Sequence, residues 1–435
     1  MSYTRKTCDF HFNSKILVTR DEHSSLSANI SVMFTKLLRK KFAGVQQPLA
    51  KHLSIMLIEL LILSPLVFLC YIWLKLKGKE ILVVGVSSPS ISVFVAPLEP
   101  ELRKRRQNNH GLDKTIVLNL SEDANSYVRR MYDEIVKIYG IESRFRRRVI
   151  WWSSKFGVKT TVPDQVFNDI SWKTMKPSIV LPSDDCERGY AYLASKGIGK
   201  DQDFVCYATR TESYYLKLIS EGVVAKPRSV RNPDEQIYLD VGSKLSEKGL
   251  PVIRMGKDLN TSLSEPNAVI DYATTKRTDA LDCFLLSKCK FLINGATGIV
   301  WFRRLFNMPS LNCDVYDIRN TQTTRDLFLF QRVRFTSSGN YATISEMLEM
   351  RSEYADERHQ ARLGVEIVRN SFHEILDACD EMNQRIDGTW VTTKEDEQLH
   401  NEYMNLVSQY SDLPAWNGGG RVGTSFLRTY RDLLC

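Results

Sequence analysis

The fold is indicated most directly by residues 291–298, which read FLINGATG. The first four, Phe291–Asn294, form an apolar run of the length and type of a buried strand. A glycine-rich turn follows at once, and the apolar spacing of a helix resumes over Ile299–Phe306. Strand, turn and helix in this order place backbone N–H groups and a helix N-terminus where an anion can bind. The turn lacks the Gly-Lys-Ser/Thr of a Walker A loop, and a tight connection without a ligand is an open alternative.

Short strands and helices alternate in the same way along much of the chain. Strands are predicted at Glu80–Val86, Thr115–Leu120, Asp203–Thr209 and Pro251–Met255, and helices at Ala124–Tyr139, Pro233–Lys248 and Asp279–Ser287. This alternation is typical of βαβ units around a parallel sheet, so we expect an α/β fold.

A polar run around Pro182–Arg188 separates two such series and is interpreted as a linker. From Thr343 the pattern becomes helical, with capping-box signatures at Thr343-x-x-Glu346 and Thr392-x-x-Glu395. We therefore expect an N-terminal α/β domain at 77–190, a second at 191–340, and a helical tail at 341–435 that packs back on them.

The charge is unevenly distributed along the chain. The net charge of the 435 residues is +8, and residues 1–79 alone hold 12 Lys and Arg against 4 Asp and Glu. A nucleic-acid binder would carry its basic excess on the folded domain, so we expect no nucleic-acid partner. The excess flanks a hydrophobic stretch instead, which favours an anionic membrane surface as the partner.

That stretch, residues 53–74, reads LSIMLIELLILSPLVFLCYIWL and includes one charge, Glu59, and one proline, Pro65. About 20 helical residues cross a bilayer, so a membrane helix over 53–76 is expected after a basic arm at 1–52. A segment that dips into one leaflet and a buried core helix are the alternatives. Basic residues flank the stretch on both sides, so the positive-inside rule does not decide its orientation. We expect the catalytic domains on the cytoplasmic side.

No metal site is predicted. The nine cysteines contain no CxxC pair, and the seven histidines contain no HExxH. In the second α/β series the only Asp-x-Asp is Asp201-Gln202-Asp203, which opens its strand and should lie at the wrong edge of the sheet for a metal-bound diphosphate.

Polar residues follow several strands of the second series, where ligands of open α/β sheets collect. The candidates for contacts with a diphosphate or its sugar are Arg210, Arg231, Asn232, Arg254, Gly256, Asp279, Asp282, Thr297 and Gly298. Arginine suits a diphosphate because its fork donates two parallel hydrogen bonds. The plainer alternatives are an N-cap role for Asn232, a capping role for Asp279, and solvated arginines.

The same residues fall into a recognisable series of motifs. They are Arg231-Asn232 before a helix, Val252-Ile253-Arg254-Met255-Gly256 at a strand end, Asp282-Cys283-Phe284-Leu285 in a helix, Thr297-Gly298 in a turn, and Leu305-Phe306 with Pro309 and Asn312. Their order resembles a bacterial family of glycosyltransferases found with surface-polysaccharide genes, over roughly residues 55–430.

The resemblance implies a glycosyltransferase of the GT-B type, with two Rossmann-like domains facing a cleft. Its C-terminal half would hold a nucleotide sugar as substrate, and a glycan or lipid-linked acceptor would approach from the N-terminal half. Such an enzyme needs no bound cofactor or metal, because arginines and a helix N-terminus stabilise the leaving diphosphate.

Two histidines of the family are missing from this chain, which reads Phe94-Val95-Ala96-Pro97 and Ala208-Thr209-Arg210 at those places. The catalytic base is therefore open, with Glu99, Glu101 and Glu212 as the nearest carboxylates. The alternative is an inactive relative that binds a glycan or a partner enzyme at the membrane. A nucleotide-sugar epimerase shares the two-domain cleft, but the hydrophobic segment counts against it.

Overall fold

The computed structural model describes residues 64–78, 80–84, 91–108, 112, 115–119, 125–140, 159–161, 171–210, 216, 219–220, 229–257, 259, 261–264, 267–275, 277–318, 325–351, 353–409 and 420–434. The expected basic arm and the first part of the expected membrane segment lie outside these residues. Residues 67–435 form one compact unit.

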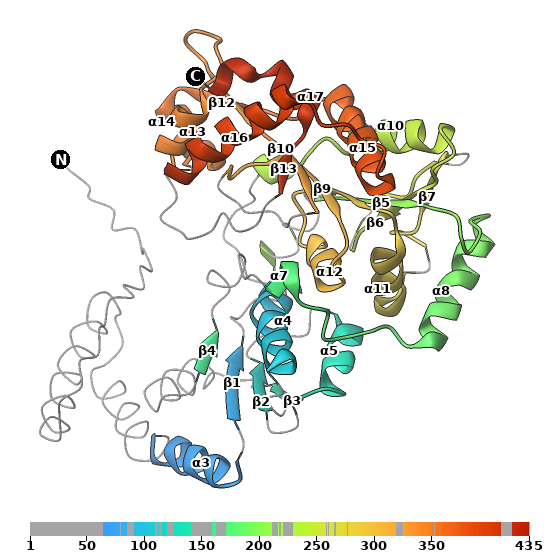
Figure 1. The fold of residues 1–435 in the computed structure, drawn as a ribbon, viewed down its shortest axis with the longest axis vertical. Coiled ribbons are helices and arrows are strands. Elements are labelled where there is room, and N and C mark those ends of the chain that lie inside the picture. Colours follow the sequence, from blue (N-terminus) through green and yellow to red (C-terminus); the bar gives the residue numbers. More distant parts are fainter. Residues whose placement is uncertain are drawn as a thin grey trace, which may run out of the picture. The chain divides into compact units, whose positions relative to one another are not determined.

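The first sheet has four parallel strands, β1 (Glu80–Val84), β2 (Thr115–Asn119), β3 (Lys137–Gly140) and β4 (Lys159–Thr161), in the order β3-β2-β1-β4. Helix α4 (Ile91–Gln107) follows β1, and α5 (Ser126–Asp133) follows β2 (Figure 1). The single helix predicted over Ala124–Tyr139 is therefore wrong in its second half. Val136 and Ile138 are buried while Lys137 and Tyr139 are exposed, which is the alternation of a strand.

The second sheet has seven parallel strands in the order β13-β10-β9-β8-β5-β6-β7. They are β5 (Val205–Thr209), β6 (Val252–Met255), β7 (Val269–Asp271), β8 (Leu292–Gly295), β9 (Ser310–Val315), β10 (Leu327–Phe330) and β13 (Arg421–Val422). The α/β fold with parallel sheets is thus confirmed. From β5 the chain adds β6 and β7 on one side, then returns to place β8, β9 and β10 on the other, so the strand order reverses between β5 and β8.

Helices cover both faces of the second sheet. One face packs on α11 (Asp279–Lys288) and α12 (Val300–Leu305), and α11 in turn contacts α8 (Ser183–Ser195). The other face packs on α10 (Glu235–Glu247), α15 (Phe372–Asp387) and α16 (Lys394–Gln409). The linker interpretation of Pro182–Arg188 is wrong, because these residues begin α8, where buried Asp185 accepts a hydrogen bond from Tyr127 at 2.6 Å.

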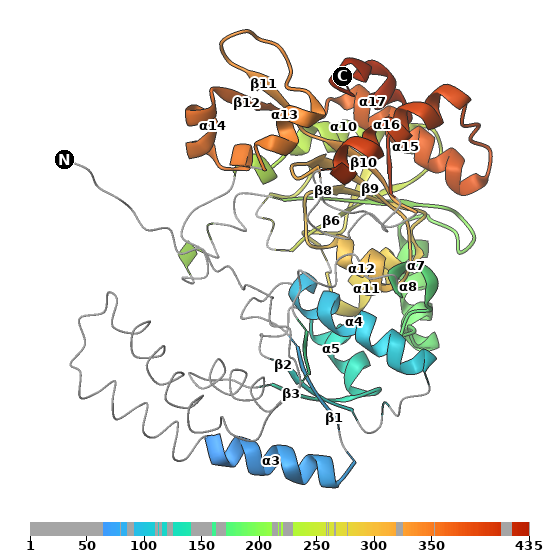
Figure 2. The same cartoon turned by 60° about the vertical axis from the view of Figure 1, so that its left-hand side comes forward.

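The two sheets are joined through their helices. Figures 1 and 2 show α11 and α12 lying between the second sheet and the pair α4 and α5. Helix α12 contacts α4, and α11 contacts α5. One hydrophobic core runs through this junction and includes Phe94 and Tyr132 from the first half and Trp301 and Leu305 from the second.

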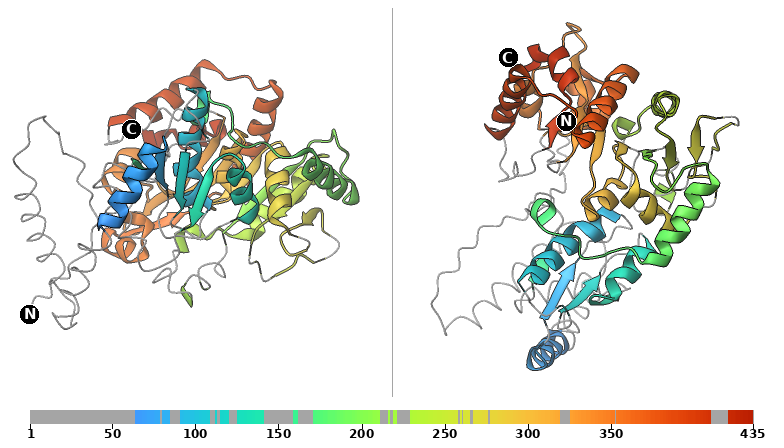
Figure 3. Two further views of the ribbon diagram at one scale, coloured as in Figure 1. Left: turned by 90° about the horizontal axis from the view of Figure 1, so that it is seen from below. Right: turned by 45° about the vertical axis from the view of Figure 1, so that its right-hand side comes forward.

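The tail after residue 340 is largely helical, but it also contributes two strands that pair with earlier strands. Strand β12 (Val365–Val368) pairs antiparallel with β11 (Arg332–Phe335) (Figure 2), and β13 extends the seven-stranded sheet beside β10 (Figure 1). Figure 3 shows this largely helical tail in orange and red. The capping box at Thr343 and Glu346 is present at the start of α13 (Ile344–Glu349). The one predicted at Thr392 is displaced by one residue, since Thr393 and Asp396 exchange the two hydrogen bonds.

Of the expected membrane helix, the structure describes α3, Ser64–Leu76. None of its residues is buried, and Leu69, Trp73 and Leu76 are 60%, 58% and 82% exposed. Among the described residues no helix combines the length and the apolar character needed to cross a membrane.

Candidate functional site

The candidate site lies where β5 and β8 end, at the point where the strand order reverses. Arg210 directly follows β5, and Ala296, Thr297 and Gly298 directly follow β8, which pairs with β5 through Thr209 and Gly295. Ligands of open α/β sheets bind outside the carboxyl ends of the strands at such a reversal. The fold therefore brings Arg210 and the glycine-rich turn, which are 86 residues or more apart in sequence, to one edge of the sheet.

The turn after β8 has a fixed, strained backbone. Ala296 adopts a left-handed conformation, with φ of 55°. The Asn294 Oδ1 accepts hydrogen bonds from the Thr297 amide at 3.2 Å and from its hydroxyl at 2.7 Å. The Thr297 Oγ1 also accepts from the Ile299 amide at 3.3 Å. The Thr297 hydroxyl, expected to donate to a ligand, therefore donates to Asn294 in this structure.

Arg231 reaches the same turn from the 3-10 turn Ser229–Arg231. Its Nη2 donates to the Ala296 carbonyl at 3.2 Å, and its guanidinium lies 5.4 Å from the centre of the Tyr316 ring. Within the described part of the chain, the buried Arg231 Nε and Asn232 Oδ1 have no hydrogen-bond partner. Unpaired buried polar atoms of this kind call for a ligand or a water molecule. Of the two residues, Arg231 is the one that contacts the turn.

Asn232 does not cap the following helix. The N-cap of α10 is Asp234, whose side chain accepts from the Gln236 amide at 3.0 Å. The start of α10 comes very close to the end of β8: a Cβ on Gly295 would lie 3.0 Å from Pro233 Cγ and 3.1 Å from the Tyr238 ring. Position 295 needs glycine because a side chain there would lie too close to Pro233 and Tyr238. The sequence pattern alone does not show this requirement.

Arg254, near the carboxyl end of β6, is held inside the protein by its ion pairs with Glu235 and Asp271. Its guanidinium is 2% exposed and donates to both Glu235 carboxylate oxygens at 2.8 and 3.0 Å and to the Thr261 carbonyl at 2.8 Å. Burial by itself would lower the pKa of Arg254, but the Glu235 carboxylate outweighs burial and raises it. These contacts give Arg254 a structural role, joining β6 to α10. Gly256, after β6, packs closely on Leu259.

Asp279 links the two halves of the molecule. Its Oδ2 accepts from the Ser126 amide at 2.9 Å and from the Ser126 hydroxyl at 2.8 Å, at the first residue of α5. Burial would raise the pKa of Asp279, but the Ser126 hydrogen bonds outweigh it and lower the pKa. The capping alternative is therefore partly right: Asp279 binds a helix start, that of α5, while Thr278 caps its own helix.

Asp282 is buried on the inner side of α11. It accepts from the Tyr272 hydroxyl at 2.8 Å and forms an ion pair with Arg277. Burial raises the pKa of Asp282 to about 6, against the opposing effects of Arg277 and Tyr272. Asp282 therefore lies in the core, in contact with Tyr272 and Arg277 from the segment between β7 and α11.

The carboxylates considered as catalytic bases have other partners. Glu99 is fully buried, pairs with Arg103 at 2.7 Å, and accepts from the Tyr132 hydroxyl at 2.7 Å and the Ser178 amide at 2.8 Å. Glu101 pairs with Arg105 at 2.9 Å. Both therefore serve the packing of α4, and Glu212 lies outside the described residues.

The structure also shows residues that the sequence did not single out. Tyr316 and Asn294 shape the turn, and Tyr238 donates to Asp314 at 3.2 Å directly behind Gly295. Burial raises the pKa of Asp314 to about 6. In the described part, no group of three or more His, Cys, Asp or Glu side chains is placed to hold a metal ion. Asp203, before β5, pairs with Lys290 at 3.0 Å at the opposite edge of the sheet.

No protein-family model matches the chain, and no curated protein matches it in sequence. Among solved structures it is similar to a glycosyl transferase family 9 protein from Veillonella parvula, with 10% identity, a TM-score of 0.38, and coverage of 54% of this chain and 80% of that one. The E. coli ADP-heptose lipopolysaccharide heptosyltransferase II gives 11% identity, a TM-score of 0.38, and 54% and 84% coverage. The iron-containing dodecameric glycosyltransferase TibC of enterotoxigenic E. coli gives 12% identity, a TM-score of 0.34, and 76% of both chains. Similarity at this level does not define a function for the chain.

Proposed function

We propose that this protein is a membrane-associated glycosyltransferase of the GT-B type that moves a sugar from a nucleotide-sugar donor to a glycan or lipid-linked acceptor. The observation that carries the proposal is the cluster at the strand reversal. There Arg210, Arg231 and the Ala296–Gly298 turn meet at the carboxyl ends of β5 and β8.

The chemistry at this edge is the stabilisation of a leaving diphosphate. Glycosyl transfer from a nucleotide sugar releases a diphosphate whose new negative charge needs fixed donors. Arg210 and Arg231 would supply such donors without a metal ion, whereas the Thr297 and Ile299 amides of the turn donate to the Asn294 and Thr297 side chains in this structure. The unpaired Arg231 Nε and Asn232 Oδ1 are consistent with a ligand at this place. Arg254, by contrast, supports the edge from beneath through Glu235.

The general base is assigned by elimination to Glu212, two residues beyond Arg210 in the sequence. Glu99 and Glu101 are held in buried ion pairs, so neither is available to take a proton from an acceptor.

A non-catalytic protein that binds a glycan or a partner enzyme is the second candidate. Where the family resemblance leads one to expect histidines, the chain has Phe94–Pro97 and Ala208, and Phe94, Ala96 and Ala208 are 1%, 0% and 2% exposed. Apolar core residues there cannot replace an acid or base, which favours this alternative.

Membrane association on the cytoplasmic side is proposed from α3 and the sequence before it. Several apolar side chains of α3 are exposed, Lys75 lies in its last turn, and Lys77 directly follows the helix. Apolar surface next to basic residues favours an anionic bilayer. Flotation of the full chain with vesicles that contain anionic lipid should carry the protein upward, even in high salt, because apolar burial is not screened.

The donor site is tested by thermal unfolding of the full chain with UDP-, GDP-, ADP-, CMP- and dTDP-sugars. A ligand at one hundred times its Kd adds about 2.7 kcal/mol to the free energy of unfolding. We expect one nucleotide to give such a shift, and Arg231→Ala and Arg210→Ala to remove it. Arg334→Ala is the matched control, because its exposed ion pair with Glu366 lies on the antiparallel pair of strands β11 and β12.

Product analysis then separates the two candidates. Transfer to an acceptor, or slow hydrolysis of the bound donor, supports the enzyme. A nucleotide-induced shift without either supports the non-catalytic protein. If no nucleotide sugar shifts the unfolding of a folded sample, the donor site is disproved.

A further inference from the structure

A groove of about 820 Å³ lies far from the proposed donor edge. It is bounded by the C-terminal ends of α4, α11 and α12 and by the segment 174–181 that leads into α8. Lys288 ends α11 four residues before β8 begins, so the groove lies at the amino edge of the seven-stranded sheet. A four-residue strand spans about 13 Å, which separates it from the turn at the other end of β8.

The charge of the groove is strongly positive. Its lining includes Arg103, Arg106, Lys176 and Lys288 and contains no Asp or Glu. Arg103 is neutralised by Glu99. In the described residues, neither exposed Lys176 nor exposed Lys288 has an ion-pair partner, and Arg106 donates only to the Ser178 carbonyl, at 3.1 Å.

The negative partial charges of the helix C-termini offset only part of this positive charge. Three helix C-termini meet here, and each carries about half a negative charge. Lys288 and Arg106 stand in the last turns of α11 and α4, where such ends favour cations. Together the three ends offset about one and a half of the three charges on Arg106, Lys176 and Lys288. A net positive field therefore remains, and Lys176 belongs to no helix.

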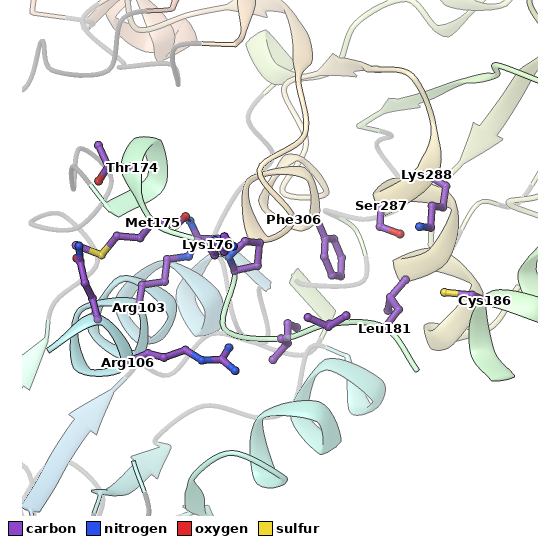
Figure 4. Close-up of a pocket in the computed structure, with 14 residues that line it drawn as sticks. Arg103, Arg106, Thr174, Met175, Lys176, Leu181, Cys186, Ser287, Lys288 and Phe306 are labelled. Carbon is purple, nitrogen blue, oxygen red and sulfur yellow. The ribbon is translucent and has the colours of Figure 1, made fainter. Parts of the chain in front are cut away.

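The lining also has polar side chains, Gln107, Thr174 and Ser287, and a larger apolar part. The members of the apolar part are Met175, Pro177, Ile179, Val180, Leu181 and Phe306. Figure 4 shows Arg103 and Lys176 toward one side, Ser287 and Lys288 toward the other, and Phe306 between them. The Val180 side chain is 79% exposed, so covering it with a hydrocarbon chain would remove apolar surface from water, which is favourable.

We propose that this groove binds a phosphorylated lipid. A phosphate monoester carries nearly two charges and three acceptor oxygens, which suits three cations better than a carboxylate does. A hydrocarbon chain attached to it would cover Val180, Leu181 and Phe306. The site is independent of the proposed donor site and of any transfer reaction.

The test uses the full chain in a neutral detergent with farnesyl phosphate as the probe. We expect Lys176→Gln and Lys288→Gln each to weaken binding about five- to tenfold. Lys196→Gln is the matched control, because Lys196 is exposed and caps the far end of α8, about 15 Å along the helix from groove residue Cys186. Partition of the probe into micelles is equal for all variants, so differences between them report the groove.

Three further arms separate the phosphate from the lipid chain. Farnesol and inorganic phosphate should each bind far more weakly than farnesyl phosphate, and Val180→Gln should weaken farnesyl phosphate but leave inorganic phosphate unchanged. Equal binding of inorganic phosphate and farnesyl phosphate would overturn the lipid assignment. Tight binding of UDP that Lys176→Gln abolishes would replace it with a nucleotide site. Binding of the probe that neither lysine variant alters would overturn the site itself.

Discussion

At the scale of single residues, Ala296 shows how the candidate site is set up. Its φ of 55° costs an L residue about 1 kcal/mol or more. Two side chains hold this conformation. Arg231 donates a hydrogen bond to the Ala296 carbonyl, and Asn294 accepts one from the Thr297 amide. The turn's amides are thereby fixed in direction before any ligand arrives, which is what stabilisation of a developing charge requires.

Asp282 is the residue from which a pH dependence is expected. Burial raises its pKa to about 6, above an unfolded value of about 3.9. A carboxyl whose pKa is raised in the folded state contributes to the free energy of unfolding, and this contribution is fully present at pH values below the unfolded pKa. That contribution is lost as pH rises through the folded pKa. The loss should therefore fall between about pH 4 and about pH 6.

We expect Asp282→Asn to remove this dependence. Relative to the native chain, the variant should gain about 2 kcal/mol in free energy of unfolding between pH 4 and pH 7. This gain comes on top of the cost of losing the ion pair with Arg277, which keeps its contact with Asp279 at 3.4 Å. Thermal unfolding across this range measures the difference, with exposed Asp240→Asn as the control. Parallel stability curves for Asp282→Asn and the native chain would contradict a raised pKa.

At the scale of elements, the strands with long apolar runs could be predicted from the sequence. Strands β1, β2, β5 and β6 fall within their expected ranges, and β8 is displaced from its expected range by one residue, because buried parallel strands appear in the sequence as continuous apolar stretches. Strand β13 could not be predicted, because it has two residues and its partner β10 lies about ninety positions earlier. Helix α8 begins with polar residues, and only its packing on α11 shows that they are helical.

The candidate site was predictable to the same extent. Arg210 and the turn 295–298 came together because carboxyl ends of parallel strands share an edge. The roles of Arg254, Asp282 and Glu99 were not predictable, because each depends on a partner from another element. Those partners, Glu235, Arg277 and Arg103, look in the sequence like ordinary surface charges.

The tail's contribution to the core leads to a second prediction. Phe426 in α17 (Thr424–Thr429) is 3% exposed, packs edge-on against Phe330 of β10 at 4.9 Å, and lies 5.7 Å from the Arg332 guanidinium. Phe426→Ala should cost about 3–5 kcal/mol in free energy of unfolding. Thermal or denaturant unfolding measures it, and Val391→Ala, at a site 80% exposed, is the control that should have little effect. A loss below about 1 kcal/mol would mean that the tail is not part of the core.

At the scale of the whole molecule, the contact between the two α/β halves is organised around Arg103. Besides Glu99, its guanidinium donates to the Leu305 carbonyl at 2.8 Å and to the Asn307 Oδ1 at 2.8 Å, both at the end of α12. It also donates to the Ser171 carbonyl at 3.2 Å and lies 4.8 Å from the Trp172 ring. One buried cation thus holds α4, α7 (Ser171–Thr174) and α12 together, and with them the two sheets.

Arg103→Met should therefore weaken the whole molecule. The methionine keeps most of the packing volume but leaves Glu99 buried without its cation, which costs about 3–5 kcal/mol. Adding Glu99→Gln removes the stranded charge while the amide oxygen can still accept from Ser178 or Tyr132. The double variant should then be more stable than Arg103→Met alone in denaturant unfolding, by about 1 kcal/mol or more. If Glu99→Gln instead lowers the stability of Arg103→Met further, the unpaired charge of Glu99 is not the main cost of removing Arg103, and the loss comes from the contacts of Arg103 with α7 and α12.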